Sequence, residues 1–164
     1  MVYIAGDYWA DQGDPFSSND DWDRASKLYQ VNATAFIVLA RELHGLVKNQ
    51  NLRGKVVAVS STSAEHGYTG APIYASSKAA LNRLVIDAAA RYGKNLSVSA
   101  VAPGPVDTPL LSTTPRGGKD EYVKETPTGK LSTPEDIAKA VVFMLENPQV
   151  SGVILAVDGG RIIG

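Results

Sequence analysis

Four short apolar runs, rich in β-branched and small residues, recur along the chain and stop at turn-forming residues. Near-continuous apolar strands are typical of a parallel sheet that is covered on both faces. The pattern therefore predicts strands at residues 1–5, 55–60, 96–101 and 153–157.

Longer segments with helical patterning separate these runs. We expect the first helix at about residues 21–48 and the second at about residues 72–92. The third has a start signal, because Thr133 stands at an N-cap position, proline follows it, and Asp136 stands at the third helical position. This helix is expected to end near Asn147. Strands that alternate with helices in this order predict an α/β fold built on a doubly wound parallel sheet.

Two polar segments interrupt the alternation, at residues 7–19 and 110–130. Loops of such length inside a compact domain usually have a function. Each segment stands between elements that belong to the same sheet, so neither divides the chain into two domains. We expect residues 1–164 to form a single domain, with residues 110–130 as a loop that acts as a lid over the substrate.

Composition and charge exclude several classes of function. Sixteen Lys and Arg residues balance 17 Asp and Glu residues, and the net charge of −1 offers no basic face for nucleic acid or for an anionic membrane. No apolar run is long enough to span a bilayer, and the acidic first residues are unlike a signal peptide, which indicates a cytoplasmic protein. Cysteine is absent and the two histidines lie far apart, so we expect no metal site.

Ser61, Tyr74 and Lys78 are the strongest candidates for chemistry. Tyr74 and Lys78 are four residues apart on a predicted helix, so their side chains share one face. An ammonium near a phenol favours the phenolate, which lowers the phenol's pKa and makes it a general acid or base near neutral pH. Ser61 follows a predicted strand at its carboxyl end, where doubly wound sheets bind ligands. The sequence therefore predicts proton transfer to or from a substrate oxygen.

The surrounding segment, VVAVSSTSAEHGYTGAPIYASSKAALNRL, resembles the core of the short-chain dehydrogenase/reductase family, with its strand-end Ser thirteen residues before the Tyr of Y-x-x-x-K. Three further segments resemble the same family: DDWDRASKLYQVNATAFIVLA its fourth helix, VAPGPVDTPL its proline–glycine turn, and GVILAVDGG its last strand and turn. The likeness covers nearly the whole chain, in order. It implies a Rossmann-like fold.

The resemblance also implies an activity, NAD(P)-dependent hydride transfer between an alcohol and a carbonyl. Ser61 would orient the substrate oxygen, Tyr74 would give or take its proton, Lys78 would lower the Tyr74 pKa and bind the cofactor ribose, and Asn32 would hold a water against Lys78. The family's enoyl reductases space Tyr and Lys more widely, and its halohydrin lyases carry Arg in place of Lys78. The spacing here therefore favours alcohol–carbonyl chemistry.

The same resemblance assigns residues to the cofactor and to the substrate. His66 and Tyr68 follow Ser61 in a loop and are candidate contacts for the small alcohol or carbonyl substrate, with surface positions as the alternative. The residues expected to contact NAD or NADP are Ala5, Gly6, Tyr74, Lys78, Pro103, Gly104, Val106 and Thr108.

One part of the family pattern is not in this sequence. The family begins with a strand, a T-G-x-x-x-G-x-G turn and a helix, and those glycines let the backbone approach the cofactor pyrophosphate. Residues 1–6 instead resemble the family's fourth strand, with Tyr3 and Ile4 in place of two asparagines. We therefore expect an N-terminally truncated sheet made of strands 4 to 7, with an exposed apolar edge and weakened or lost cofactor binding. The alternative is a cofactor-free, non-catalytic protein that binds or oligomerises through this half-fold.

Two helical stretches also indicate a partner. Residues 33–40 are apolar on all sides and residues 84–90 nearly so. A helix that is apolar all round is buried all round. We therefore expect a homo-oligomer that forms through the helices at residues 21–48 and 72–92, with loops covering these faces as the alternative.

Overall fold

The computed structural model describes residues 1–8, 22–66, 70–113 and 118–163. Its four strands pair in parallel in the order β1-β2-β3-β4. The predicted α/β architecture and the four predicted strand positions are confirmed, with small shifts of the bounds. The strands are β1 at Val2–Tyr3, β2 at Gly54–Val59, β3 at Leu96–Pro103 and β4 at Ile154–Val157.

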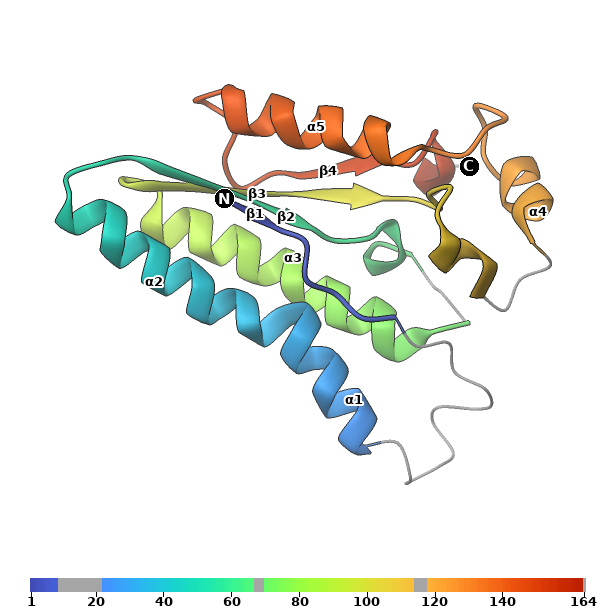
Figure 1. Ribbon diagram of the computed structural model, residues 1–164, viewed down its shortest axis with the longest axis horizontal. Helices are drawn as coiled ribbons and strands as arrows, with labels where there is room; N and C mark the ends of the chain where they lie inside the picture. The colour runs from blue at the N-terminus through green and yellow to red at the C-terminus, as the bar shows by residue number, and fades with distance from the viewer. Residues whose placement is uncertain (9–21, 67–69, 114–117, 164) are drawn as a thin grey trace.

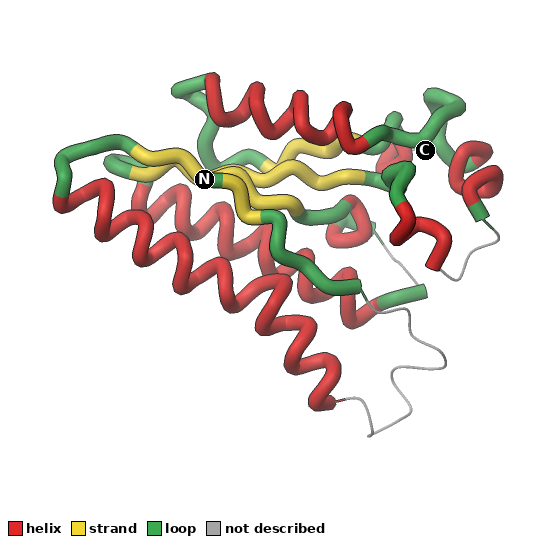
Figure 2. The backbone as a smooth tube through the Cα atoms, in the orientation of Figure 1, coloured by secondary structure: helices red, strands yellow, loops and turns green. Residues whose placement is uncertain are grey.

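Helices cover the sheet on both faces (Figure 1). Helices α2 (Ala35–Asn49) and α3 (Pro72–Tyr92) lie on one face, and α5 (Pro134–Glu146) lies on the other. The backbone tube shows the strands as a single layer between these helices (Figure 2). Parallel sheets need this double cover because their strands are apolar on both sides.

Two apolar clusters fill the two interlayer spaces. Phe36 and Leu81 belong to the cluster between the sheet and helices α2 and α3. Val101 and Met144 belong to the cluster between the sheet and α5. The start of α5 matches its sequence signal, since Thr133 accepts a hydrogen bond from the Asp136 backbone and the Asp136 side chain accepts one from the Thr133 backbone.

The helix predicted at residues 21–48 is continuous but not uniform. It consists of α1 (Trp22–Tyr29), a π-helical segment at Gln30–Thr34, and α2. Such segments insert one residue into a helix and occur frequently at functional sites. The Tyr3 hydroxyl donates a hydrogen bond of 2.5 Å to the carbonyl oxygen of Val31 inside this segment. The π-helical segment turns the next residue, Asn32, into the interior, where it is fully buried.

The described parts of residues 110–130 contain regular structure that the predicted loop did not include. The structure places a 3₁₀ turn at Pro109–Thr113 and helix α4 at Lys119–Lys124 within or beside this span. Tyr122 is buried at 3% exposure and fixes α4 against the rest of the molecule. The prediction of a plain loop was therefore wrong for these parts of the segment, because an aromatic anchor outweighs the local Gly, Pro and Thr content.

Strand β1 forms one margin of the sheet. Within the described ranges it pairs with β2 alone. The apolar side chains of Val2 and Ile4 are exposed, at 37% and 70%. The expected apolar edge is thus present in the described residues. Among those residues, none of the helices has the length and apolarity that a bilayer crossing requires.

Candidate active site

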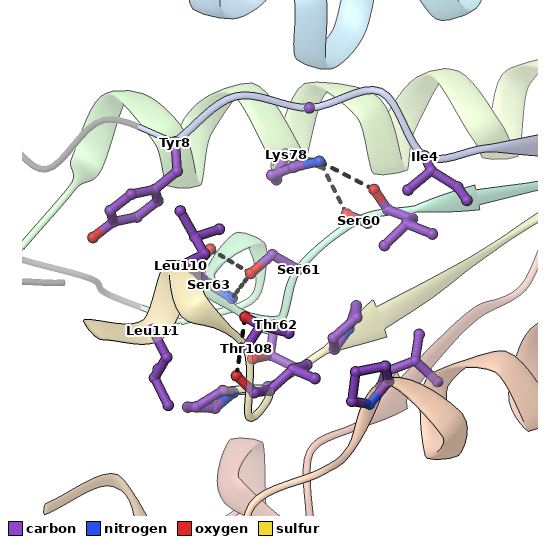
Figure 3. A pocket seen from close by; sticks show the side chains of 18 of the residues that line it. Ile4, Tyr8, Ser60, Ser61, Thr62, Ser63, Lys78, Thr108, Leu110 and Leu111 are labelled. Atoms are coloured by element: carbon purple, nitrogen blue, oxygen red, sulfur yellow. Dashed lines mark hydrogen bonds between the residues drawn. The ribbon is translucent and has the colours of Figure 1, made fainter. Parts of the chain in front are cut away.

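A cavity of about 740 Å³ opens where the carboxyl ends of β1, β2 and β3 meet. Figure 3 shows side chains from the segments that follow these strands, together with Lys78 from α3, around this space. Ala5 and Asn32 do not line the cavity, and Tyr68 lies outside the described residues. The predicted site residues that do line it are Gly6, Ser61, His66, Tyr74, Lys78, Pro103, Gly104, Val106 and Thr108.

Lys78 is the buried cation of this cavity, at 4% exposure. Its ammonium donates a hydrogen bond of 3.0 Å to the carbonyl oxygen of Val59, at the end of β2. It also lies 5.9 Å from the centre of the Tyr74 ring, so the two side chains share one helix face as predicted. Burial lowers the pKa of Lys78 to about 8. The charge is therefore held beside the phenol at a cost in hydration.

Gly6 allows the segment after β1 to approach this cation closely. A Cβ atom added at Gly6 would lie 3.1 Å from Lys78 Nζ and 3.5 Å from Asn32 Oδ1. Any larger side chain would displace the ammonium or the amide. Gly6 therefore forms a wall of the site, and the lack of a side chain is what lets the backbone lie so close to Lys78 and Asn32.

Asn32 holds this wall in place. Its Oδ1 accepts a hydrogen bond of 2.8 Å from the Asp7 backbone N–H, and its Nδ2 donates one of 3.0 Å to the Asp7 carbonyl oxygen. The same Nδ2 donates a 2.9 Å bond to Ser77 Oγ. Ser77 in turn donates to the carbonyl oxygen of Tyr74, at 2.7 Å. Asp7 and Ser77 were missed by the sequence reasoning; for Ser77 the signal was its position directly before Lys78.

Ser61 lies at the N-terminus of a short 3₁₀ turn, Thr62–Ala64. Its Oγ accepts hydrogen bonds from Ser63 at both the backbone N–H, 3.2 Å away, and the hydroxyl, 2.8 Å away. A hydroxyl that accepts twice still has its own proton to donate. Ser60, which precedes it in the sequence, is buried, and its hydroxyl donates a hydrogen bond of 3.4 Å to the Lys78 carbonyl oxygen.

Tyr74 is half-buried and packs edge-on against Tyr8, with 5.0 Å between the ring centres. Tyr8 was also missed, since it lies in a polar stretch with no recognisable pattern. It covers one side of the Tyr74 ring and thereby narrows the space in which the phenol can move. His66 is exposed and lines the cavity.

The proline–glycine turn after β3 packs directly on the turn after β4. A Cβ atom at Gly104 would lie 2.7 Å from Asp158 Cβ. The Asp158 carboxylate accepts bonds of 2.9 Å from the Gly160 N–H and 2.8 Å from the Ile162 N–H, which hold this second turn. The two strand ends therefore form one continuous floor. No grouping of metal-ligating side chains occurs in the parts of the chain that the structure describes.

The family model that matches residues 6–161 is described as enoyl-(acyl carrier protein) reductase. The 3-oxoacyl-[acyl-carrier-protein] reductase FabG of Thermotoga maritima is 31% identical over 148 residues, which are 88% of this chain and 58% of that protein. The human (3R)-3-hydroxyacyl-CoA dehydrogenase is 33% identical over 147 residues, which are 87% of this chain and 55% of that protein. The chain thus spans a little over half the length of these curated relatives.

Solved structures agree with these matches. A 7 alpha-hydroxysteroid dehydrogenase complexed with NADH and 7-oxo glycochenodeoxycholic acid superposes with a TM-score of 0.86 at 30% identity, covering 97% of this chain and 62% of that one. ElxO with NADP bound superposes with a TM-score of 0.87 at 24% identity, covering 99% and 67%, a likeness that concerns the fold alone. With the family model matching almost from end to end and relatives above 30% identity, the chain belongs to the short-chain dehydrogenase/reductase family.

Proposed function

We propose that the protein is an NAD(P)-dependent oxidoreductase that exchanges a hydride between an alcohol and a carbonyl. The observation that carries the proposal is the convergence of Ser61, Tyr74 and Lys78 on one cavity. Relatives named for oxoacyl and hydroxyacyl substrates support alcohol–carbonyl chemistry. The four-residue spacing of Tyr74 and Lys78 favours this over the enoyl reduction in the name of the family model.

Three side chains take part in the proton transfer in this proposal. The Ser61 hydroxyl donates a hydrogen bond to the substrate oxygen and so orients it. Tyr74 gives its phenolic proton to that oxygen during reduction and takes one back during oxidation. Lys78 stabilises the phenolate through its charge, 5.9 Å from the ring centre.

The family resemblance assigns a bound water to Asn32, and one lone pair of Oδ1 is available to accept a hydrogen bond from it. Both Nδ2 protons are donated, to the Asp7 carbonyl and to Ser77. Oδ1 accepts one bond, from the Asp7 N–H, and has a second lone pair. That oxygen and the Lys78 ammonium both lie next to Gly6, 3.5 Å and 3.1 Å from the position that a Cβ atom would take there. We propose that a water bound there continues the proton path from Lys78.

The residues present fit the nicotinamide end of a cofactor. Lys78 would hold the ribose, the floor at Pro103–Gly104 would lie under the ring, and the space kept open at Gly6 would admit it. Val106 and Thr108 would complete this end, whereas Ala5 does not line the cavity. Bound there, NAD or NADP would supply the hydride. The pyrophosphate has no glycine-rich turn within residues 1–164, so we expect this chain by itself to bind either cofactor weakly or not at all.

We further propose a single partial Rossmann-like catalytic domain that works in the cytoplasm as a homo-oligomer. Helix α2 exposes Ile37, Val38 and Leu46 at 46%, 50% and 59%, and α3 exposes Ile86 at 40%. Exposed apolar side chains on two adjacent helices support association through these faces. Residues 110–130 border the cavity through Leu110 and Tyr122, so this lid would set which small alcohol or carbonyl is accepted.

The test is turnover of a panel of carbonyl substrates with NADH and with NADPH. Wild-type protein is compared with Tyr74→Phe and with the control Tyr92→Phe, whose ring stacks on His44 at the far end of α3. Because this chain is expected to bind the cofactors weakly, each cofactor is supplied at high concentration. Under these conditions we expect measurable turnover by the wild type and the control, and loss of turnover in Tyr74→Phe. Absence of turnover in the wild-type protein, together with tight self-association, would favour the cofactor-free binding or oligomerisation protein instead.

A further inference from the structure

Arg161 is a cavity-lining cation that the proposed reaction does not use. It follows the turn at residues 158–160 and lines the same cavity as Tyr74 and Lys78. Its backbone is held on both sides, because the Asp158 carboxylate accepts from the N–H groups of Gly160 and Ile162. Figure 1 shows this C-terminal segment beside helix α4. The Arg161 side chain therefore extends from a backbone that is fixed by hydrogen bonds, and it contacts the lid at Tyr122.

The guanidinium is fixed but incompletely paired. It lies over the ring of Tyr122, with 5.1 Å from Cζ to the ring centre, and Nη2 donates to the Glu125 carboxylate. The other amino group, Nη1, is fully buried and has no hydrogen-bond partner among the described residues. Buried donors without partners are rare in folded proteins, since each forfeits its hydration. A charged donor in this state indicates a place for an acceptor that the described residues do not supply.

The charges around the site favour an anionic acceptor. The Arg161 side chain is 12% exposed, whereas that of Glu125 is 37% exposed, so solvent screens the carboxylate more than the guanidinium. Besides tyrosines, the other ionisable residues on the cavity are Asp7, His66 and Lys78, and the Lys78 ammonium donates one hydrogen bond to Val59. Nη2 already donates to Glu125, so Nη1 is the amino group left to bind a ligand, and the positive charge of the guanidinium favours a carboxylate over a neutral oxygen.

We propose that Arg161 binds a carboxylate on the substrate, so that the protein prefers oxo acids and hydroxy acids to neutral ketones and alcohols. The inference rests on the proposed oxidoreductase function and names its substrate class. Because Nη1 is buried, the side chains that cover it would shift to let the carboxylate accept from it, while Glu125 and Tyr122 keep the guanidinium oriented from the lid side.

Levulinate and its longer oxo-acid homologues, each paired with its methyl ester, test the proposal. Each pair shares the reacting ketone; the ester lacks the charge and carries one added methyl group. We expect wild-type protein to show a KM at least about tenfold lower for the acid of the best-fitting length than for its ester, the range expected for a hydrogen bond to a charged group. Arg161→Met should remove this preference by raising the KM of the acid alone. The control Arg91→Met, at an exposed position near the end of α3, should leave it intact.

Glu125→Gln separates ligand binding from lid attachment. If Arg161 serves the substrate, removing the competing carboxylate should leave the KM of the acid unchanged or lower it. If Arg161 only ties α4 down, Glu125→Gln and Arg161→Met should weaken acid and ester alike, and that result would overturn the proposal.

Binding without turnover separates this inference from the function on which it rests. Saturation-transfer NMR detects levulinate on the protein in the absence of any cofactor. Binding that is lost in Arg161→Met and kept in Arg91→Met would support the carboxylate site even if no ketone were reduced. Turnover of the esters without any preference for the acids would leave the oxidoreductase intact and refute the role of Arg161.

Discussion

The Lys78 ammonium donates a hydrogen bond of 3.0 Å to the carbonyl oxygen of Val59, and so joins the middle of α3 to the end of β2. Among the described residues this neutral carbonyl is the only hydrogen-bond acceptor that meets the buried cation. Because no anion among these residues offsets the loss of hydration on burial, the pKa of Lys78 is lowered to about 8. Under the proposed function, this charge serves the reaction at Tyr74 at a cost to the stability of the fold.

Lys78→Met should consequently stabilise the protein near neutral pH. The pKa falls from 10.5 to about 8, and each unit corresponds to about 1.4 kcal/mol. The lost hydrogen bond to Val59 offsets about 1 kcal/mol of that gain. We expect the free energy of unfolding, measured with urea at about pH 7, to rise by about 1–3 kcal/mol.

The same variant should show a defined pH dependence. Because the folded-state pKa of Lys78 is lowered, the burial penalty is fully present below pH 8 or so and disappears as the pH rises toward 10.5. The advantage of Lys78→Met should therefore shrink across this window. A variant that is less stable than the wild type at both ends of the window would show that the ammonium is not buried at a cost.

Gly6→Ala should impair activity with little effect on stability. The added methyl group would lie 3.1 Å from Lys78 Nζ and 3.5 Å from Asn32 Oδ1, so the ammonium has to shift. We expect kcat/KM to fall at least about tenfold, since small displacements of catalytic groups have large effects. In the control Gly45→Ala, within α2, a Cβ atom meets nothing within 4 Å and should raise helix stability slightly. Equal activity of the two variants would refute the role of Gly6 as a wall of the site.

Gly159→Ala should loosen the lid. Gly159 has a φ of +67°, and a Cβ atom there would lie 2.5 Å from Thr126 Cγ2 and 2.5 Å from Thr128 Oγ1. Gly129 has nearly the same φ, +70°, with nothing within 4 Å, so Gly129→Ala isolates the backbone strain. Thermal unfolding should show about 1 kcal/mol of loss for Gly129→Ala and about 2–4 kcal/mol for Gly159→Ala. Equal losses would mean that the lid can move aside freely.

Strong local signals predicted much of this molecule. The bounds of α3 agree with the pattern of apolar residues, and the capping box of Thr133 and Asp136 marks the start of α5 at the expected position. The placement of Tyr74 and Lys78 on one face follows from helix geometry alone. These features depend on neighbours in sequence, which is why they could be recognised without coordinates.

Features that depend on distant contacts could not be recognised. The π-helical segment at Gln30–Thr34 is supported by Tyr3, 28 residues before Val31, and nothing in the local sequence marks it. Helix α4 is stabilised by the burial of Tyr122, although the flanking sequence is rich in Gly and Pro. The unpaired Nη1 of Arg161 likewise becomes visible only when the turn after β4 meets the lid.

The proton-transfer role of Tyr74 is the claim on which the account depends, and the pH profile of kcat for alcohol oxidation tests it most directly. In wild-type protein kcat should rise as the phenol ionises, and Tyr74→Phe should lower it by about 100-fold or more and leave it independent of pH. A Tyr74→Phe variant that retains both the rate and the profile of the wild type would contradict the account.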